Sequence, residues 1–410
     1  MSKLEELIKE FCPNGVIRVT IGKICKISRG IVMSKDFIRD NHGDYPVYSS
    51  QTENNGCLGY INTYKYDGEY VTWTTDGANA GTVFYRSGKF SITNVCGLLE
   101  VKDLMVVNTK YLYYALSIEA RRYVNQGMGN PKLMSNIMAS VQIPLPALPV
   151  QREIVRILDS FTLYSAELTA ELTARRKQYE FYRDKLLNFG NAKLVVKNKK
   201  LKELCMSIKD GMHNLPVTTD ENTGYPVLSA MNIYDGQIHY DAKRFVSREV
   251  FEQESKRTKI ETGDVLLTIV ATIGRTAVVE NSTSFLLQRS VCALKPSKEI
   301  LSKYLKYYLD TNAIQNYIFA NAHGSAQAGL YLNQVADIEV VLPPMEVQER
   351  IVKVLDNFDA ICSDLGIGLP AEIEKRQKQY EYYREKLLTF DGKYATILTE
   401  RNGTERNGQG

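Results

Sequence analysis

Two stretches of the chain carry a helical pattern of apolar residues, and their sequences are nearly the same. Residues 151–161 read QREIVRILDSF and residues 348–358 read QERIVKVLDNF. A second matching pair, KQYEFYRDKLLNF and KQYEYYREKLLTF, begins at Lys177 and at Lys378. The copies lie about half the chain apart, whereas the long segments before them barely match. A duplication on this scale predicts two tandem modules with pseudo-two-fold symmetry.

In the first copy, apolar residues recur at heptad spacing, which is the pattern of a coiled-coil helix. The first seam consists of Ile154, Phe161, Leu168, Arg175, Tyr182 and Phe189, and the companion seam of Leu158, Leu172, Tyr179 and Leu186. A continuous helix over residues 150–189 would be roughly 60 Å long at 1.5 Å per residue. It contains a four-residue repeat, SAELTAELTA, at residues 165–174. Adding or removing one unit would change the spacing between the two helix ends, although simple helix-favouring drift explains the repeat equally well.

The second copy is interrupted, because residues 365–370 read LGIGLP, and glycine and proline break helices. The sequence predicts a helix over about 346–364, a short loop, and a second helix over about 370–389. Pro370 would stand in the first turn of that second helix, where its missing N–H costs little. We expect the helices of the two copies to pair in an antiparallel arrangement.

The segments before each helical region alternate short strand-like runs with turn residues, which is typical of mixed α/β domains. Runs such as EYVTWTT and ITNVCGLLEV in the first half have counterparts DVLLTIV and RSVCALKP in the second. This comparison aligns Gly81 with Gly274 and Cys96 with Cys292. The predicted segments are 1–148, a first mixed α/β domain; 149–190, a central helical spacer; 191–345, a second mixed α/β domain; 346–390, a C-terminal helical region; and 391–410, a disordered tail.

Composition adds little to this picture but excludes several classes of protein. The hydrophobic content of 44% and charged content of 24% are those of a soluble globular protein, and no apolar run is long enough for a membrane span. The first ten residues carry charges throughout, so we expect a cytoplasmic protein. Seven cysteines are scattered singly, which predicts reduced thiols and no metal site. The net charge of +4 permits nucleic-acid binding without requiring it.

Motifs for catalysis are missing from the sequence. No GxxxxGK[ST] loop is present, so ATP hydrolysis by this chain is not expected. Asn130-Pro131 is followed by Lys132 rather than by the proline and aromatic residue that adenine methylation would need. Asp264 and Glu280 alone are a weak basis for a nuclease site.

The duplicated segments closely resemble the two conserved regions of Type I restriction–modification specificity subunits, over roughly residues 15–390. The ELTAELTA run is similar to a spacer repeat in one branch of that family. The resemblance implies a non-catalytic subunit whose two target recognition domains each read half of a split double-stranded DNA sequence. It also implies docking of two modification subunits, which methylate adenine at N6, and of restriction subunits. S-adenosylmethionine, ATP and Mg would be used by these partners, and no cofactor by this chain.

Reading DNA requires polar side chains on rigid loops, where Arg or Lys suits guanine and Asn or Gln suits adenine. The candidates in the first domain are Ser28, Arg29, Lys35, Thr74, Thr75, Asn79, Asn130 and Lys132. In the second they are Lys209, His213, Asn214, Asn232, Arg275, His323, Ser325 and Gln327. Turn capping is the competing explanation for each of them. Residues proposed for the helix seam or for subunit contact are Ile154, Phe161, Leu168, Leu172, Tyr179, Tyr182, Tyr380 and Tyr383.

We therefore expect an α/β (α+β) protein in which two tandem mixed α/β target recognition domains are separated by long antiparallel coiled-coil helices. Its expected partners are DNA and the other subunits of the enzyme, and no membrane. A fused enzyme and a structural coiled-coil adaptor remain as alternatives. The adaptor would show no salt-dependent affinity for DNA. The target bases and the gap between half-sites cannot be read from the sequence.

Overall fold

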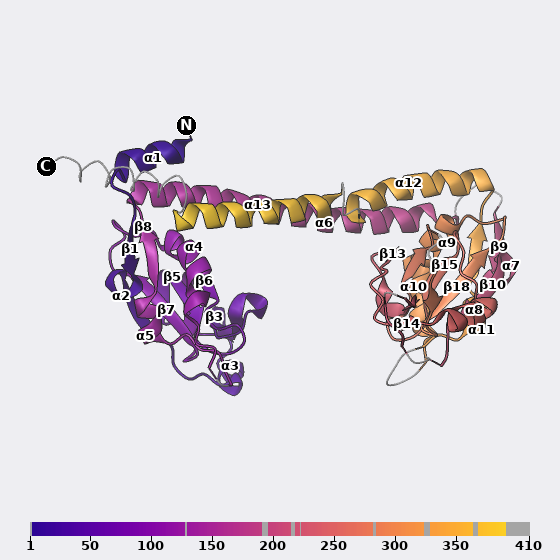
Figure 1. Ribbon diagram of the computed structural model, residues 1–410, viewed down its shortest axis with the longest axis horizontal. Coiled ribbons are helices and arrows are strands. Elements are labelled where there is room, and N and C mark those ends of the chain that lie inside the picture. Colours follow the sequence, from indigo (N-terminus) through magenta and orange to yellow (C-terminus); the bar gives the residue numbers. More distant parts are fainter. Residues whose placement is uncertain are drawn as a thin grey trace. The chain divides into compact units, whose positions relative to one another are not determined.

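The chain forms two compact units, each built around one α/β domain (Figure 1). The computed structural model describes residues 2–127, 129–190, 196–214, 218–221, 223–281, 284–323, 329–363 and 368–390. The first unit comprises Met1–Glu167 and Glu374–Gly410, and the second comprises Leu168–Ile373. The boundaries fall inside helices α6 (Leu148–Leu186) and α13 (Leu369–Thr389). The units do not coincide with the five segments predicted from the sequence, so those segment boundaries stay a prediction.

A six-stranded sheet in the order β2-β7-β5-β6-β3-β4 forms the first domain. Its strands are β2 (Cys25–Arg29), β3 (Tyr45–Tyr48), β4 (Cys57–Ile61), β5 (Tyr66–Thr74), β6 (Val83–Ile92) and β7 (Cys96–Val101). Strands β1 (Ile17–Thr20) and β8 (Gln142–Leu145) make a separate antiparallel pair. The other helices are α1 (Lys3–Phe11), α2 (Ile21–Ile24), α3 (Lys35–Asp40), α4 (Thr109–Glu119), α5 (Ser135–Ser140) and the 3₁₀ segments Glu53–Gly56 and Ala120–Tyr123. Helix α4 packs between the sheet and the first part of α6, so one apolar core joins all three.

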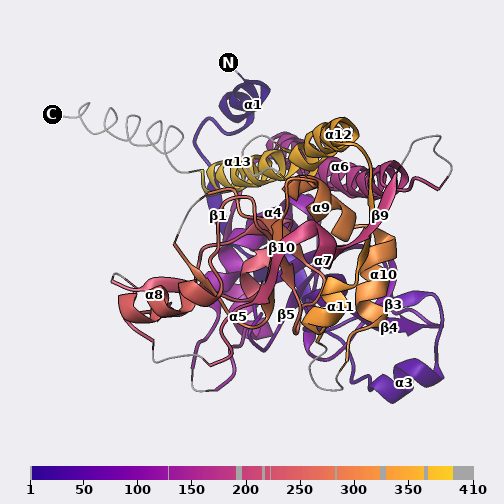
Figure 2. The same cartoon turned by 90° about the vertical axis from the view of Figure 1, so that its right-hand side faces the viewer.

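The second domain repeats this plan with smaller sheets, in the orders β10-β18-β15-β16 and β14-β11-β17. Their strands are β10 (Cys205–Asp210), β11 (Tyr225–Leu228), β14 (Phe245–Val246), β15 (Val265–Thr268), β16 (Thr276–Val278), β17 (Leu286–Leu287) and β18 (Val291–Pro296). Two further pairs join β12 (Ile233–Tyr234) to β13 (Gln237–Ile238) and β9 (Lys197–Lys200) to β19 (Glu339–Leu342). The helices are α7 (Leu201–Leu204), α8 (Arg248–Arg257), α9 (Ser302–Leu309), α10 (Asn312–Ala320), α11 (Leu332–Ala336), α12 (Met345–Ser363) and the 3₁₀ segment Ala230–Asn232. Helix α9 packs between this sheet and α12, and α8 lies across the domain from α10 and α11 (Figure 2).

The predicted helices are confirmed, including the break in the second copy. One helix, α6, covers the first seam up to Tyr182 and ends at Leu186, so Phe189 of the predicted seam lies beyond it. The second copy forms α12, which ends at Ser363, and α13, which begins at Leu369. Pro370 stands in the first turn of α13, as predicted. Residues 364–367 and the tail 391–410 lie outside the described residues.

Each unit contains an antiparallel helix pair made from both copies of the duplicated segment. In the first unit Phe161 of α6 stacks on Tyr383 of α13, with ring centroids 5.5 Å apart and planes at 25°. In the second unit Phe358 of α12 stacks on Tyr182 of α6, at 5.8 Å and 26°. Phe161 and Phe358 are equivalent in the repeat, as are Tyr383 and Tyr182. The same contact is therefore made twice, with the roles of the two copies exchanged.

Burial along the seam is strongest near the α/β domains. Ile154 and Leu158 are fully buried in the first core, and Tyr380 packs against it. Tyr179 packs in the second core. Between these ends Leu168 is 7% exposed, Leu172 is half-buried and Arg175 is exposed. The seam thus acts mainly by fixing each domain to its helix pair.

A buried glutamine ties each domain to the start of its helix. The Gln151 side chain accepts from the N–H of Asn108 at 2.8 Å and donates to the carbonyls of Val106 and Pro146, both at 2.8 Å. Its counterpart in the second unit, Gln348, accepts from the N–H of Leu301 at 3.0 Å and donates to two carbonyls in the same way. These bonds explain why the glutamine survives in both copies.

About two turns further along the helix, an aspartate is bound by the adjacent domain helix. Asp159 accepts from Lys110 and from Tyr114 of α4, each at 2.7 Å. Asp356 accepts from Lys303 at 3.1 Å and from Tyr307 at 2.6 Å, both on α9. The junction between the long helix and the domain helix is therefore built from the same Asp, Lys and Tyr side chains in both units.

The sequence alignment of Cys96 with Cys292 is wrong by one residue. Strand pairing places Trp73 opposite Gly97 in the first domain and Leu267 opposite Cys292 in the second. Cys292 is thus the counterpart of Gly97. Position 97 is a glycine because the indole of Trp73 fills the space that a side chain there would occupy. A Cβ on Gly97 would lie 2.2 Å from the Trp73 ring. In the first domain Trp73 on β5 fills this place by itself. In the second domain the place is filled by two smaller side chains, Leu267 on β15 and Cys292 on β18.

Candidate nucleic-acid interface

In both domains, five loops meet at the end of the sheet that lies away from the glutamine junction. In the first domain β2 and β5 end there and β7 begins there, since Arg29 pairs with Gly97 and Thr74 with Cys96. We call the residues at this end the loop cluster. It comprises residues 29–32, 48–51, 74–82, 92–96 and 125–133 in the first domain, and 209–213, 228–232, 268–275, 287–291 and 323–330 in the second. Residue 128 and residues 324–328 lie outside the described residues.

The same main-chain hydrogen bonds hold both loop clusters together. The N–H of Thr93 donates to Tyr48 at 2.9 Å and that of Gln288 to Leu228 at 2.8 Å. The N–H of Asn94 donates to Ile31, and that of Arg289 to Met212, both at 2.9 Å. Two further bonds are repeated. The N–H of Thr75 donates to the carbonyl of Val95, as that of Ile269 does to Ser290. The N–H of Leu133 donates to the carbonyl of Thr75, as that of Leu330 does to Ile269. Because only main-chain atoms form these bonds, no particular donor or acceptor side chain is needed for them.

A glycine in each cluster allows two loops to come this close. A Cβ on Gly30 would lie 1.9 Å from the carbonyl oxygen of Ile92, and one on Gly211 would lie 2.0 Å from that of Leu287. The adjacent residues form parallel bridges in both domains, Ile31 with Thr93 and Met212 with Gln288. These glycines are therefore required by packing rather than by a left-handed backbone.

The turn after the central strand is duplicated as well. The N–H groups of Gly81 and Gly274 donate to the carbonyls of Thr74 and Thr268, each at 2.9 Å, which confirms the predicted alignment of the two glycines. Both glycines have positive φ, at 82° and 89°, so the turn favours a residue without a side chain. The hydroxyls of Thr74 and Thr268 bond inside their own turns.

Three predicted DNA-binding residues are buried, which corrects their assignment. Thr74 and Thr75 have no exposed surface, and the Thr75 hydroxyl donates to Val95 at 2.9 Å while accepting from Arg29. Asn232 is 8% exposed and its amide donates to the carbonyl of His239 at 3.1 Å. All three stabilise turns, which was the competing explanation for their residue types, and they are not available to a base.

Most of the other predicted residues are exposed on or beside the loop clusters. Arg29 is half-buried beside Thr75, and the Asn79 amide donates to Thr52 at 3.0 Å. Arg275 is exposed and donates to the carbonyl of Ile233 at 3.3 Å. Exposed side chains at or near the cluster are Lys35, Asn130, Lys132, Lys209, His213, Asn214 and His323, and Ser28 is half-buried. Ser325 and Gln327 lie outside the described residues.

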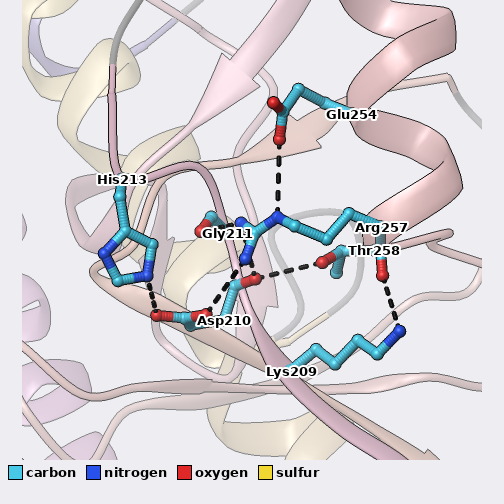
Figure 3. A network of polar contacts seen from close by, with 7 residues as sticks. All are labelled: Lys209, Asp210, Gly211, His213, Glu254, Arg257 and Thr258. Carbon is cyan, nitrogen blue, oxygen red and sulfur yellow. Dashed lines mark hydrogen bonds and ion pairs between the residues drawn. The ribbon is translucent and has the colours of Figure 1, made fainter.

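In the second domain, a network of charged side chains fastens the loop after β10 to the end of α8 (Figure 3). The Arg257 guanidinium donates to the carbonyl of Asp210 at 3.2 Å and to that of Gly211, and lies 3.5 Å from the Asp210 carboxylate. That carboxylate also contacts His213 Nε2 at 2.6 Å. Lys209 Nζ reaches back to the carbonyl of Arg257 at 2.8 Å. The network presents an imidazole and an ammonium group on a fixed loop.

A basic pocket of about 210 Å³ opens beside this network. It is lined by residues that include Lys209, Lys256, Arg257, Lys259 and Lys295. Part of this positive charge is compensated, because Lys259 and Lys295 form ion pairs with Glu261. These two ammonium groups lower the pKa of Glu261 to about 2. The pocket lining stays rich in cationic groups even so.

Chemistry other than binding has little support at the loop clusters. Among the residues that the structure describes, no group of three or more His, Cys, Asp or Glu side chains could hold a metal ion. Burial raises the pKa of the Cys96 thiol to about 12, so this thiol stays protonated at neutral pH. The clusters instead present exposed Asn, Lys, Arg and His side chains on a rigid frame, which is what base and phosphate contacts require.

Comparison with known proteins decides the family. The sequence matches the family described as Type I restriction modification DNA specificity domain over residues 13–175 and again over residues 195–375. The chain belongs to this specificity family. It is 35% identical over 374 residues to a putative type I specificity subunit of Mycoplasma pneumoniae, covering 90% of this chain and 96% of that one. A putative type I restriction enzyme specificity subunit of Haemophilus influenzae is 29% identical, covering 85% and 89% of the two chains.

Solved structures of specificity subunits share the fold. A specificity subunit from M. genitalium aligns with a TM-score of 0.55 at 16% identity, over 91% of this chain and 96% of that one. A chain from a study of complex assembly and conformational transition of the type I system aligns with a TM-score of 0.61 at 15% identity, over 91% and 97%. These similarities confirm two tandem α/β domains, and membership of the family makes this chain a DNA-recognition subunit rather than a catalyst. The described helices include none long and apolar enough to cross a membrane.

Two candidate recognition residues, Asn94 and Arg289, were missed by the sequence reasoning. The incorrect alignment of the cysteines placed Asn94 opposite Ser290, whereas the repeated hydrogen bonds pair Asn94 with Arg289. Both side chains are exposed. The signal in the sequence was a polar residue two positions after the end of strand β6 at Ile92 or of strand β17 at Leu287.

Replacing Arg257 by alanine is expected to loosen the loop after β10 without unfolding this specificity subunit. Arg257 is 42% exposed, so its ion pairs contribute modestly to stability, but its bonds to Asp210 and Gly211 hold the loop locally. Amide hydrogen exchange over residues 209–214 should become about 5-fold faster, corresponding to roughly 1 kcal/mol. Arg248→Ala is the control, since Arg248 lies on the same helix and its ion pair with Glu252 does not involve the loop after β10. Equal exchange in both variants would contradict this role.

Proposed function

We propose that this chain is the subunit that selects the DNA target of a Type I restriction–modification enzyme, with each recognition domain reading one half of a split sequence. The observation that carries the proposal is the pair of loop clusters, which share one main-chain frame but differ in exposed side chains. Two identical frames with different polar residues suit two different half-sites. A structural adaptor would have no need for this combination of a fixed frame and varied side chains.

The helices support a spacing role in the proposal. Helix α6 is continuous through the SAELTAELTA repeat, so its length is set by the number of four-residue units, each adding about 6 Å. Asp159 and Asp356 fix each domain to its helix through the same pair of bonds. The gap between half-sites would then be determined by the helices rather than by the domains.

The partners in this proposal are two modification subunits, which methylate adenine at N6, and restriction subunits. Phe181 and Tyr382 are equivalent in the repeat and are 61% and 59% exposed, although their neighbours Tyr179 and Tyr380 are packed in the cores. An exposed aromatic side chain kept in both copies suits docking of two copies of one partner. The proposal assigns S-adenosylmethionine, ATP and Mg to those partners and none to this chain, which would work on DNA in the cytoplasm.

The test is the methylome of a methylation-free host that expresses this chain together with the methyltransferase encoded beside it. A split motif with N6-methyladenine in both halves, absent when this chain is omitted, is the expected result. Omission of the chain is the control for methylation by the partner alone. No new methylation from a soluble and assembled pair would overturn the proposal and favour the adaptor.

A further inference from the structure

A four-residue turn has the same main-chain bonds in both loop clusters. The turns are residues 93–96 and 288–291. The N–H of the first residue donates to the last carbonyl of β3 in the first domain and of β11 in the second. The second residue donates to the loop after β2 or β10, and the fourth donates back to the first, at 3.0 Å for Cys96 and 2.9 Å for Val291. These three hydrogen bonds hold the second residue in the same place in both domains.

The side chain at that second position differs in a way that matters for DNA. It is Asn94 in the first domain and Arg289 in the second, and both are exposed. Among the residues described by the structure, neither side chain has a hydrogen-bond or ion-pair partner. Turn capping, the usual role of an exposed asparagine, therefore does not account for Asn94, whose amide bonds to no described group. An exposed arginine without an acidic partner is equally unexplained by the stability of its own domain.

The surroundings of the turn agree with a binding role. Its neighbours in the first domain are Arg29 and Ile31, and in the second Met212 and His213, the imidazole held by Asp210. Asparagine can bond two atoms of adenine and arginine two atoms of guanine along the major-groove edge. A rigid turn that carries such a side chain loses little entropy on binding.

We propose that Asn94 and Arg289 are equivalent base-reading residues, with Asn94 reading an adenine in one half-site and Arg289 a guanine in the other. This inference rests on the proposed function and names the residues that carry it out. The alternative for Arg289 is a phosphate contact, which would weaken binding to all sequences alike. A base contact instead relaxes one position of one half-site.

Variants of each residue test the proposal, with the methylome of the complete complex as the readout. Arg289→Ala should make one G·C position degenerate in one half-site, with a roughly 10- to 100-fold loss of discrimination there, and leave the other half unchanged. Asn94→Ala should do the same at one A·T position in the opposite half. Lys298→Ala is the control, because it removes an exposed positive charge from the second domain near the start of α9, away from the loop cluster.

The outcomes separate this inference from the proposed function. A wild-type complex that yields no split motif refutes the proposed function itself. A split motif that is unchanged by both substitutions refutes only the base-reading role. If a variant methylates too weakly for a motif to be determined, binding of its purified complex to a library randomised in one half-site replaces the methylome. A uniform loss of affinity across that library would identify a phosphate contact and overturn the proposal.

Discussion

Replacing Gly30 by alanine is expected to destabilise the first unit by about 3 kcal/mol. The new Cβ would lie 1.9 Å from the carbonyl oxygen of Ile92, far inside van der Waals contact. The obstacle is the main chain of β6, which pairs with β3 at that residue, so no side-chain rotation can relieve the clash. The loop after β2 would have to leave the cluster, breaking the bond from Asn94 to Ile31.

The single tryptophan provides the measurement. Trp73 is fully buried in the first domain, so its fluorescence during urea denaturation reports on that unit. The midpoint should fall by about 1–2 M urea in Gly30→Ala.

Two further glycine substitutions serve as controls. Gly88→Ala in the same unit meets no atom within 4 Å and should cost only the strain of its positive φ, about 1 kcal/mol. Gly211→Ala carries the same clash in the other unit and should leave the tryptophan transition in place. A shift in Gly30→Ala no larger than that in Gly88→Ala would show that the loop accommodates a side chain.

The second large effect concerns Trp73 and Gly97. Gly97→Cys alone should destabilise the first domain by about 3 kcal/mol, because its Cβ would stand 2.2 Å from the indole ring. Trp73→Leu alone should cost a similar amount, since it opens a cavity and leaves the carbonyl of Leu133 without the indole N–H that donates to it at 2.9 Å. The double variant should be more stable than Gly97→Cys, because leucine and cysteine are the pair that fills this place in the second domain.

Hydrogen exchange of β5 and β7 measures this coupling, since the fluorescence probe is lost with Trp73. We expect an interaction free energy of about 2 kcal/mol between the two positions. Leu267→Trp is the reciprocal control, because Cys292 leaves no room for an indole and the second domain should be destabilised. Additive effects of the two substitutions in the first domain would mean that positions 73 and 97 do not share one packing site, which would contradict this prediction.

The helices were predictable from the sequence because their signals are local. Heptad spacing located α6, and the glycines and proline in LGIGLP located the end of α12 and the start of α13 within two residues. Gly81 and Gly274 could be aligned because the turn that they close demands a positive φ. Such features depend on a few neighbouring residues, so a single sequence is enough to find them.

The recognition surface was only partly predictable, since it depends on which strands pair and in what register. Aligning the Val-Cys pairs was reasonable by residue type, but strand pairing makes Cys292 the counterpart of Gly97. Thr74 and Thr75 resembled surface polar residues, yet the sheet and the loop around Leu133 cover them. Helix α8, which fastens the loop that carries His213, has no counterpart among the described residues of the first domain, so the repeat could not reveal it.

The main-chain frame shared by the two loop clusters has a consequence for how such a protein can change over generations. Substitutions at exposed positions such as Asn94 or Arg289 remove no bond from the frame, so each should alter stability by less than about 0.5 kcal/mol. Gly30 and Gly211 have no such freedom. With the proposed reading roles, single substitutions at these positions would change the target sequence and leave the fold intact.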